Sequence, residues 1–489
     1  MPVMSHTSSS SSVAARQVVI ASSVFFVASS AFVVWFKRRA RCRATKLVEL
    51  ANHLVRRGPL VDCSNVNVRA KILNAAMNRV LNFWHHIETS LEKAQPLSSQ
   101  VGGLSTPQSG KKKKPLLFVP PDFVLKPLHT DERGFREIAF YESLRLSSGS
   151  HNELNVVRRV EMEYGRLPEM DQLAFASQSS KKNELDEIGD RVGIFDQVAM
   201  KLALLTNDEE VKKLDSLSRK AWRELRDEIE SLHRLSKFTA TYYGIVGQET
   251  STSYEISADS YIMFDDLTAN FSKPCVMDLK IGTKTYEDDA HYTKREREIC
   301  KYKQQAYFGF RVTGMRVYDP SLSQELSEDG FLFFDKYYGR SLLTVEDVEK
   351  AFCTFFKTYN DPESLKLFNE ELALSEGRDF EITELQKRWN VQTTVVRVGI
   401  IDEIIEQVSC IQEWFRNNHR FVFRSSSLLF VYEGDLMKGS SSNDNVVVKM
   451  IDFGHIQRSK NIDEGYLTGL NNLLDFLTRI RNNYSNSTK

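Results

Sequence analysis

Hydrophobic and polar positions follow two different periods along this chain. In the segments 115–128, 239–247, 253–268 and 445–455, apolar residues run together or alternate with polar ones over short distances. Such runs are typical of β-strands, because successive side chains of a strand point to opposite faces of a sheet. The pattern therefore predicts strands in these four segments.

Longer segments carry apolar residues at every third or fourth position, as amphipathic helices do. Helices are expected in 46–55 and 68–94, and further ones in 131–146, 215–235 and from His291 onward. Helices and strands in the same part of the chain predict the α+β class. With 489 residues, the chain is long enough for one large two-lobed catalytic unit and accessory segments.

The amino end carries a separate signal. Residues 18–36 form an apolar stretch of 19 residues without a charge, and the basic cluster KRRARCR follows at 37–43. A helix of this length can cross a membrane, and an excess of Lys and Arg marks the cytosolic side. We expect a single-pass transmembrane helix with the catalytic domain in the cytosol, at the endoplasmic reticulum or the outer mitochondrial surface. The alternative is a cleaved secretory signal, which is usually shorter.

Composition divides the chain into four parts. The membrane anchor and its basic flank occupy 1–43, and a short helical stalk follows at 44–94. A run rich in Ser, Gly and Pro, together with four lysines, predicts a flexible linker at 95–115. Residues 116–485 are expected to form the catalytic domain, within which the charged and weakly patterned segment 144–236 is an insertion or lobe extension.

Overall charge and cysteine content exclude several functional classes. Lys plus Arg and Asp plus Glu both number 65, so no global charge field favours a nucleic acid, and none is expected as a partner. The six cysteines are scattered without a C-x-x-C pair. This spacing predicts reduced thiols and argues against a zinc site.

Three charged residues stand where a nucleotide kinase needs them. Lys126 lies in the first strand-like run, Glu142 in the helical segment after it, and Asp452 at the end of a β-branched run. Kinases use a Lys–Glu ion pair to hold the lysine on ATP phosphates, and an aspartate that leaves a strand to bind Mg²⁺. Taken singly, such residues are more often a snorkelling lysine or a helix cap.

A polar break at 265–268 separates the two halves of this set. We expect this break to be the hinge of a two-lobed, kinase-like domain with its ATP cleft between the lobes, and Asp265 and Leu267 to contact ATP there. A protein kinase is excluded, because the chain has no H-R-D loop and no G-x-G-x-x-G motif. There is no Walker A motif either.

The stretch PCVMDLKIG directly follows the hinge and sets a carboxylate two positions before an ammonium group. Alternation along a strand places Asp278 and Lys280 on the same face. The simple alternative is an exposed ion pair on an edge strand. From the residues alone, Asp278 would be a candidate general base.

Several motifs resemble those of the inositol polyphosphate kinase family. Pro274, Asp278, Lys280 and Gly282 match its P-x-x-x-D-x-K-x-G signature, and RSSSLLFVYEG (424–434) and KMIDFGH (449–455) match its later motifs. The shorter matches VLKPL, FYESL, YYGIV, GFRVTGMRVY, DKYYGR and DEGYLTGLNNLL follow in the family order. The resemblance covers most of 116–480, and DKYYGR looks most like the hexakisphosphate kinase branch.

This resemblance implies specific roles. Asp278 would reach the ATP ribose hydroxyls, Lys280 would bridge the transferred phosphate and an inositol phosphate, and Asp452 would hold Mg²⁺. Lys294, Lys301 and His455 fall at positions where related kinases bind their substrate. The departures are Gly454, where many relatives carry Ala, and the long segment 144–236.

The helix predicted after His291 adds a basic face. Lys294, Arg297 and Lys301 are spaced i, i+3 and i+7, which aligns them along one side. A highly phosphorylated ring needs several cations that converge on it. The alternative is a solvated helix, since Glu296 and Glu298 lie between them.

The preferred hypothesis is a monomeric, Mg²⁺- and ATP-dependent inositol hexakisphosphate kinase that forms a diphosphoinositol phosphate. The first alternative is an inositol polyphosphate multikinase acting on less phosphorylated rings. The second, from another class, is a membrane-tethered inositol phosphate sensor or scaffold with a degenerate kinase fold. The presence of all five candidate residues argues against a degenerate fold: Lys126, Glu142, Asp278, Lys280 and Asp452.

Overall fold

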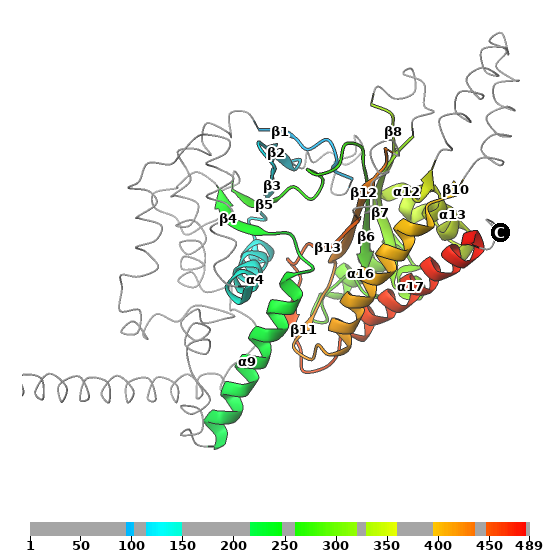
Figure 1. The fold of residues 1–489 in the computed structure, drawn as a ribbon. Coiled ribbons are helices and arrows are strands. Elements are labelled where there is room, and N and C mark those ends of the chain that lie inside the picture. Colours follow the sequence, from blue (N-terminus) through cyan, green and yellow to red (C-terminus); the bar gives the residue numbers. More distant parts are fainter. Residues whose placement is uncertain are drawn as a thin grey trace, which may run out of the picture. The chain divides into compact units, whose positions relative to one another are not determined.

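The computed structural model describes seven stretches of the chain (Figure 1). These are residues 94–101, 114–148, 216–246, 260–319, 329–358, 395–435 and 446–485. The chain divides into two compact units, and the sheets described below belong to the unit made of Pro59–Glu184, Arg191–Gln197 and Glu228–Lys489. The predicted anchor (18–36), nearly all of the stalk (44–94) and most of the segment 144–236 lie outside the described residues.

A first antiparallel sheet contains the strands predicted around Lys126 and before the hinge. Its order is β1-β2-β3-β5-β4. The strands are β1 (Gln95–Pro96), β2 (Leu117–Val119), β3 (Phe123–Pro127), β4 (Tyr242–Val246) and β5 (Tyr261–Asp265). Helix α4 (Glu132–Ser148) packs against this sheet through Tyr141, whose ring stacks on Tyr242 at 5.5 Å and meets Phe264 edge-on at 4.7 Å.

A second antiparallel sheet, of order β13-β12-β6-β7-β8, carries the signature stretch in its centre. The strands are β6 (Pro274–Ile281), β7 (Phe310–Tyr318), β8 (Phe331–Phe334), β12 (Ser427–Glu433) and β13 (Val446–Ile451). With helices α4, α10 (Tyr292–Lys301) and α16 (Val398–Arg416), this arrangement confirms mixed α and β structure.

Helices cover one face of the second sheet (Figure 1). Phe310 packs edge-on against Phe352 of α13 (Val345–Phe355) and Phe476 of α17 (Glu464–Ser485), at 6.0 and 5.5 Å between ring centroids. Helix α16 (Val398–Arg416) lies beside α17, and Phe415 stacks on Tyr466 at 4.1 Å. Because this face is filled with apolar side chains, polar residues of β6 are left to the opposite face.

Further elements complete the described part. They are α9 (Ser216–Ser236), α10 (Tyr292–Lys301), α11 (Gln305–Phe308), α12 (Lys336–Ser341), β9 (Lys357–Thr358), β10 (Val395–Val396), β11 (Phe421–Val422) and β14 (Gln457–Arg458). The helices predicted at 131–146, 215–235 and from His291 are therefore confirmed as α4, α9 and α10. His291 is the N-cap of α10, and its side chain accepts from the Thr293 N–H.

The prediction of a flexible linker from residue 95 is wrong for 95–101. Gln95 and Pro96 pair with β2, and Val101 is buried in a cluster with Val276 and Val431. Gly314 makes this packing possible, since a Cβ there would stand 2.0 Å from the Val101 carbonyl oxygen. Burial of the apolar Val101 fixes this segment, although the Ser- and Gly-rich residues beside it had predicted a flexible linker.

The carboxyl end of the proposed insertion is also part of the core. In α9, Leu232 and Leu235 are fully buried, and the Ser231 carbonyl accepts a hydrogen bond from the Trp414 indole at 2.9 Å. Glu228 is buried and binds the Arg458 guanidinium, with an N···O distance of 2.5 Å. The segment 228–236 is thus an integral helix, since one face of its charged sequence is apolar.

Candidate active site

The polar break at 265–268 lies where the chain passes from one sheet to the other, because β5 ends at Asp265 and β6 begins at Pro274. The Asp265 carboxylate accepts a hydrogen bond from the Tyr243 hydroxyl at 2.5 Å. The next N–H, that of Asp266, donates to the Asp122 carbonyl at 2.8 Å. Leu267 is half-buried in the turn that follows. The passage between the sheets lies at the predicted break, whereas a hinge at this position and ATP contacts of Asp265 and Leu267 stay predictions.

Lys126 lies on β3 between two carboxylates. Its Nζ is 2.6 Å from Glu137 Oε1 and 2.5 Å from Asp452 Oδ1. Burial alone would lower the pKa of Lys126, but the charges of Asp452 and Glu137 outweigh it and raise the pKa above its ordinary value. Lys126 is therefore held on β3 as a cation.

The predicted Lys126–Glu142 ion pair is wrong, and Glu137 takes that place. Both glutamates lie on α4, but they are five positions apart, which is about 140° around a helix at about 100° per residue. Glu142 accepts instead from the Tyr242 hydroxyl at 2.9 Å and lies 3.6 Å from Arg145 Nε. Its role is to join α4 to the first sheet.

Asp452 directly follows β13 and has a left-handed backbone, with φ of +66°. Glu137 also fixes this turn, because its Oε1 accepts from the Phe453 N–H at 3.2 Å. Burial would raise the pKa of Asp452, but Lys126 and Lys280 outweigh it and hold the pKa well below its ordinary value. The side chain keeps 43% of its surface exposed, so an ionised carboxylate remains accessible here.

Asp278 and Lys280 lie on the face of β6 that the helices leave uncovered, as the alternation predicted. Their neighbours Leu279 and Ile281 are fully buried, and Ile281 meets Gly469 of α17. Asp278 is buried, and its Oδ1 has no hydrogen-bond partner within the described ranges. Burial and the nearby charge of Asp452 raise the pKa of Asp278.

Lys280 donates through Nζ to the Ser425 carbonyl at 2.5 Å. Burial lowers the pKa of Lys280, although the charges of Asp452 and Asp278 oppose this shift. The charge of Asp452 therefore acts on both Lys126 of β3 and Lys280 of β6. An ammonium group that is only partly neutralised in a buried place is suited to bind a phosphate.

The carboxylate of Asp452 fits a hard cation that also binds phosphate. Among the residues that the structure describes, no group of three or more His, Cys, Asp or Glu side chains could hold a metal by itself. Mg²⁺ is commonly held through one or two carboxylates together with substrate phosphates and water. The exposed Asp452 carboxylate could supply such an oxygen.

The predicted basic face on α10 exists, but acidic residues engage it. Lys294 donates to Glu287 Oε2 at 2.6 Å, and Lys301 donates to Glu298 Oε1 at 2.5 Å. Arg297 lies 3.9 Å from Glu298 and is 67% exposed. Glu298, one of the two interleaved glutamates named in the solvated alternative, therefore accounts for part of this face.

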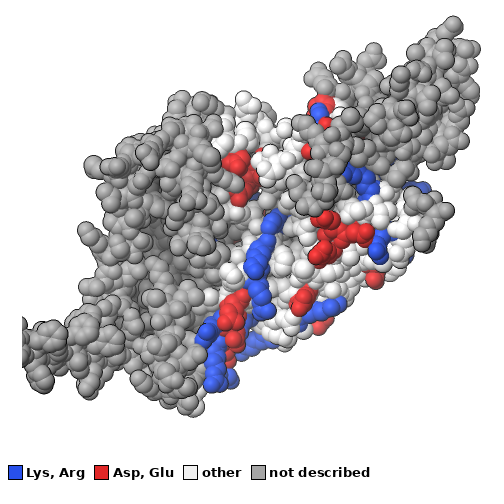
Figure 2. Space-filling view, in the orientation of Figure 1, with Lys and Arg blue, Asp and Glu red and all other residues white. Residues whose placement is uncertain are grey.

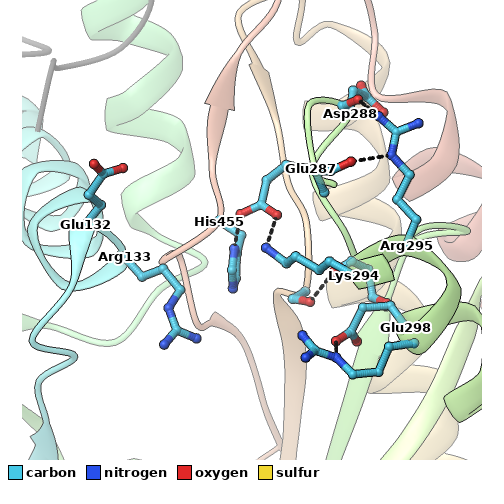
Figure 3. A network of polar contacts seen from close by, with 12 residues as sticks. Glu132, Arg133, Glu287, Asp288, Lys294, Arg295, Glu298 and His455 are labelled. Atoms are coloured by element: carbon cyan, nitrogen blue, oxygen red, sulfur yellow. Dashed lines mark hydrogen bonds and ion pairs between the residues drawn. The ribbon is translucent and has the colours of Figure 1, made fainter. Parts of the chain in front are cut away.

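His455 meets Lys294 at the same carboxylate, as Figure 3 shows: Nδ1 of His455 contacts Oε1 of Glu287, whose Oε2 binds Lys294. Arg136 of α4 approaches Glu287 to 3.8 Å. The structure thus brings His455 and Lys294 together from segments far apart in the sequence. Glu287 and Arg136 were not predicted, although Glu287 lies in the acidic run YEDD directly after the signature.

Charges of both signs are interspersed over the described part of the face in Figure 2, where Lys and Arg side chains stand beside Asp and Glu. This distribution agrees with the equal totals of basic and acidic residues. With equal totals of charge, a bound anion would have to be held by local cations.

Comparison with known proteins matches part of this chain to one family. A family model described as inositol polyphosphate kinase matches residues 261–376 and 378–478. The matched residues include the break at 265–268, Asp278, Lys280, α10 and Asp452. The matched part of the chain is similar to the inositol polyphosphate kinase family.

Individual relatives in this family come from two branches. Over 203 residues the chain is 31% identical to the inositol polyphosphate multikinase of Homo sapiens, a match covering 42% of this chain and 38% of that protein. Over 242 residues it is 27% identical to inositol hexakisphosphate kinase 3 of Mus musculus, covering 45% of this chain and 51% of the relative. The matches thus span about half or less of the relatives' own length.

A solved structure of an inositol phosphate multikinase from S. cerevisiae, in complex with ADP and Mn²⁺, matches 50% of this chain at 23% identity and a TM-score of 0.36. The similarity to the inositol polyphosphate kinase family therefore rests on the sequence matches, and the site geometry rests on the contacts described above.

Proposed function

We propose that this chain is an ATP-dependent inositol polyphosphate kinase. The observation that carries the proposal is the contact between Lys126 and Asp452, at 2.5 Å, next to the uncovered face of β6 with Asp278 and Lys280. A cation for ATP phosphates, a carboxylate for a metal and a second cation for the acceptor are the parts that phosphoryl transfer needs.

Each group has a role in this reaction. Lys126, held by Glu137, would bind ATP phosphates, and Asp278 would accept hydrogen bonds from the ribose hydroxyls. Asp452 would be the main protein ligand of Mg²⁺. The bound metal would neutralise part of the negative charge on the phosphates. Lys280 would contact the transferred phosphate and the acceptor, so that catalysis consists of positioning and charge neutralisation.

We propose inositol hexakisphosphate as the acceptor, which would give a diphosphoinositol phosphate, on the strength of the motif DKYYGR at 335–340. A less phosphorylated ring, as used by a multikinase, is the second candidate. The observation in its favour is that Glu287 and Glu298 already bind Lys294 and Lys301, which lowers the positive charge available to the ring.

The test offers the purified full chain inositol tris-, pentakis- and hexakisphosphate in parallel, with Mg²⁺ and γ-labelled ATP. We expect label in the inositol phosphate and the highest kcat/KM for the hexakisphosphate. Preference for the trisphosphate would favour the multikinase. Binding of all three rings without any transfer would overturn the kinase proposal in favour of a scaffold.

We also propose that residues 18–36 anchor the chain in a membrane. The support is the sequence alone: 19 residues without a charge, followed by a basic cluster. No helix within the described ranges is long and apolar enough to cross a membrane.

Deletion of residues 1–43 should move the protein into the soluble fraction while kcat for the inositol phosphate is kept, because the proposed catalytic residues all lie beyond residue 115. The measurement is fractionation after an alkaline wash, followed by an activity assay. A matched control deletes only 1–17 and should stay in the membrane fraction. If the longer deletion still pellets, residues 18–36 are not the anchor.

A further inference from the structure

One carboxylate lies at the centre of the cations proposed to bind the substrate. Glu287 keeps only 10% of its side chain exposed, and it contacts Lys294 of α10 at 2.6 Å, Arg136 of α4 at 3.8 Å and the Nδ1 atom of His455 after β13 (Figure 3). Hydrogen bonds from His455 and Lys294 outweigh burial and lower the pKa of Glu287, so the carboxylate is ionised at neutral pH.

Neutralising these cations does not explain why an acid is buried among them. Lys294 keeps 35% of its side chain exposed, so water can solvate its ammonium group without a carboxylate. Arg136 approaches Glu287 only at ion-pair distance, and its Nη1 has no hydrogen-bond acceptor among the described residues. The cluster thus retains capacity for a further anion.

A buried negative charge at this point opposes every phosphate that enters the cluster. A phosphate monoester carries about 1.5 to 2 negative charges at neutral pH, so the repulsion grows with the number of phosphates on the ring. At the same time, Glu287 occupies hydrogen-bond donors of Lys294 and His455 that a phosphate would otherwise use.

We propose that Glu287 is a specificity-determining residue that occupies the position of one substrate phosphate and thereby makes the preference for hexakisphosphate over less phosphorylated rings smaller than it would be without this charge. This inference rests on the proposed function, because it takes Lys294 and His455 as substrate-binding groups. A ring that lacks a phosphate at this position leaves the Glu287 contacts intact, whereas a fully phosphorylated ring must displace them. Glu287 acts through charge and occupancy and takes no part in the transfer itself.

The test is Glu287→Gln in the full chain, because the amide keeps the size and one acceptor oxygen but removes the charge. We expect the affinity for inositol hexakisphosphate, measured by calorimetry without ATP, to rise about tenfold, and the affinity for a trisphosphate to change much less. The ratio of kcat/KM values for the two rings should shift in the same direction. Added salt should shrink the difference between variant and wild type, since screening acts on the removed charge.

The matched control is Glu349→Gln, which removes one charge from an ion pair with Arg479 at 3.2 Å, between α13 and α17. It should leave both affinities unchanged. If Glu287 only positions Lys294 and His455, Glu287→Gln will weaken all rings alike, and the inference is overturned. The inference also fails if Glu287→Gln has the same ratio of affinities for hexakisphosphate and trisphosphate as wild type, provided that wild type phosphorylates one of the rings. If wild type neither binds nor phosphorylates any ring, the proposed function itself fails.

Discussion

Asp452→Asn should reduce kcat for phosphoryl transfer by about a thousandfold or more, the size of effect expected when a preorganised charge is removed from the reacting phosphates. The carboxylate is ionised and 43% exposed, next to Lys126 and Lys280. Asparagine tolerates the left-handed backbone at this position, so the turn after β13 should be preserved. The effect should therefore come from lost charge and metal binding, not from misfolding.

Two further measurements separate these causes for Asp452→Asn. Binding of ATP without a divalent cation should stay near the wild-type level, and the thermal unfolding midpoint should change little. A control variant, Asp475→Asn, removes an exposed carboxylate of α17 and should keep full activity. Turnover of Asp452→Asn close to that of wild type would remove this residue from the metal role.

Glu137→Gln should raise the KM for ATP about ten- to hundredfold, which corresponds to the loss of one charge-assisted hydrogen bond. Glu137 Oε1 lies 2.6 Å from Lys126 Nζ, and without its charge Asp452 is the remaining carboxylate partner of the lysine. The lysine would then be drawn toward the metal ligand and away from the phosphates. The Gln oxygen can still accept from the Phe453 N–H, so the turn should hold.

Glu142→Gln is the matched control, since it removes the same charge from the same helix. Its partner is the Tyr242 hydroxyl, which can donate to an amide oxygen as well. The KM for ATP should therefore stay close to that of wild type. Equal effects of the two variants, or a larger effect of Glu142→Gln, would contradict the assignment of Glu137 to Lys126.

The periodic features of the sequence predicted much of the fold. Alternation placed Lys126 on a strand and set Asp278 and Lys280 on one face of β6, because the pleat of a strand forces side chains apart in this way. The polar break at 265–268 predicted the passage between the sheets. Each of these signals depends only on residues that are close together in the chain, so it can be read from a single sequence.

Contacts between distant segments could not be predicted in the same way. The choice between Glu137 and Glu142 depends on which side of α4 faces Lys126, and both acids lie in the same periodic segment. The meeting of Glu287 with Arg136 and His455 joins segments more than 150 positions apart. Burial of Val101 depends on Gly314, where the lack of a side chain leaves room for it.

The measurement that tests the central claim most directly is a crystal structure of the full chain with Mn²⁺, a non-hydrolysable ATP analogue and inositol hexakisphosphate. We expect an anomalous peak within about 2.3 Å of an Asp452 carboxylate oxygen, a nucleotide phosphate on Lys126, and a ring phosphate on Lys280. A metal bound away from Asp452, or a ring bound away from Lys280, would contradict the proposed active site.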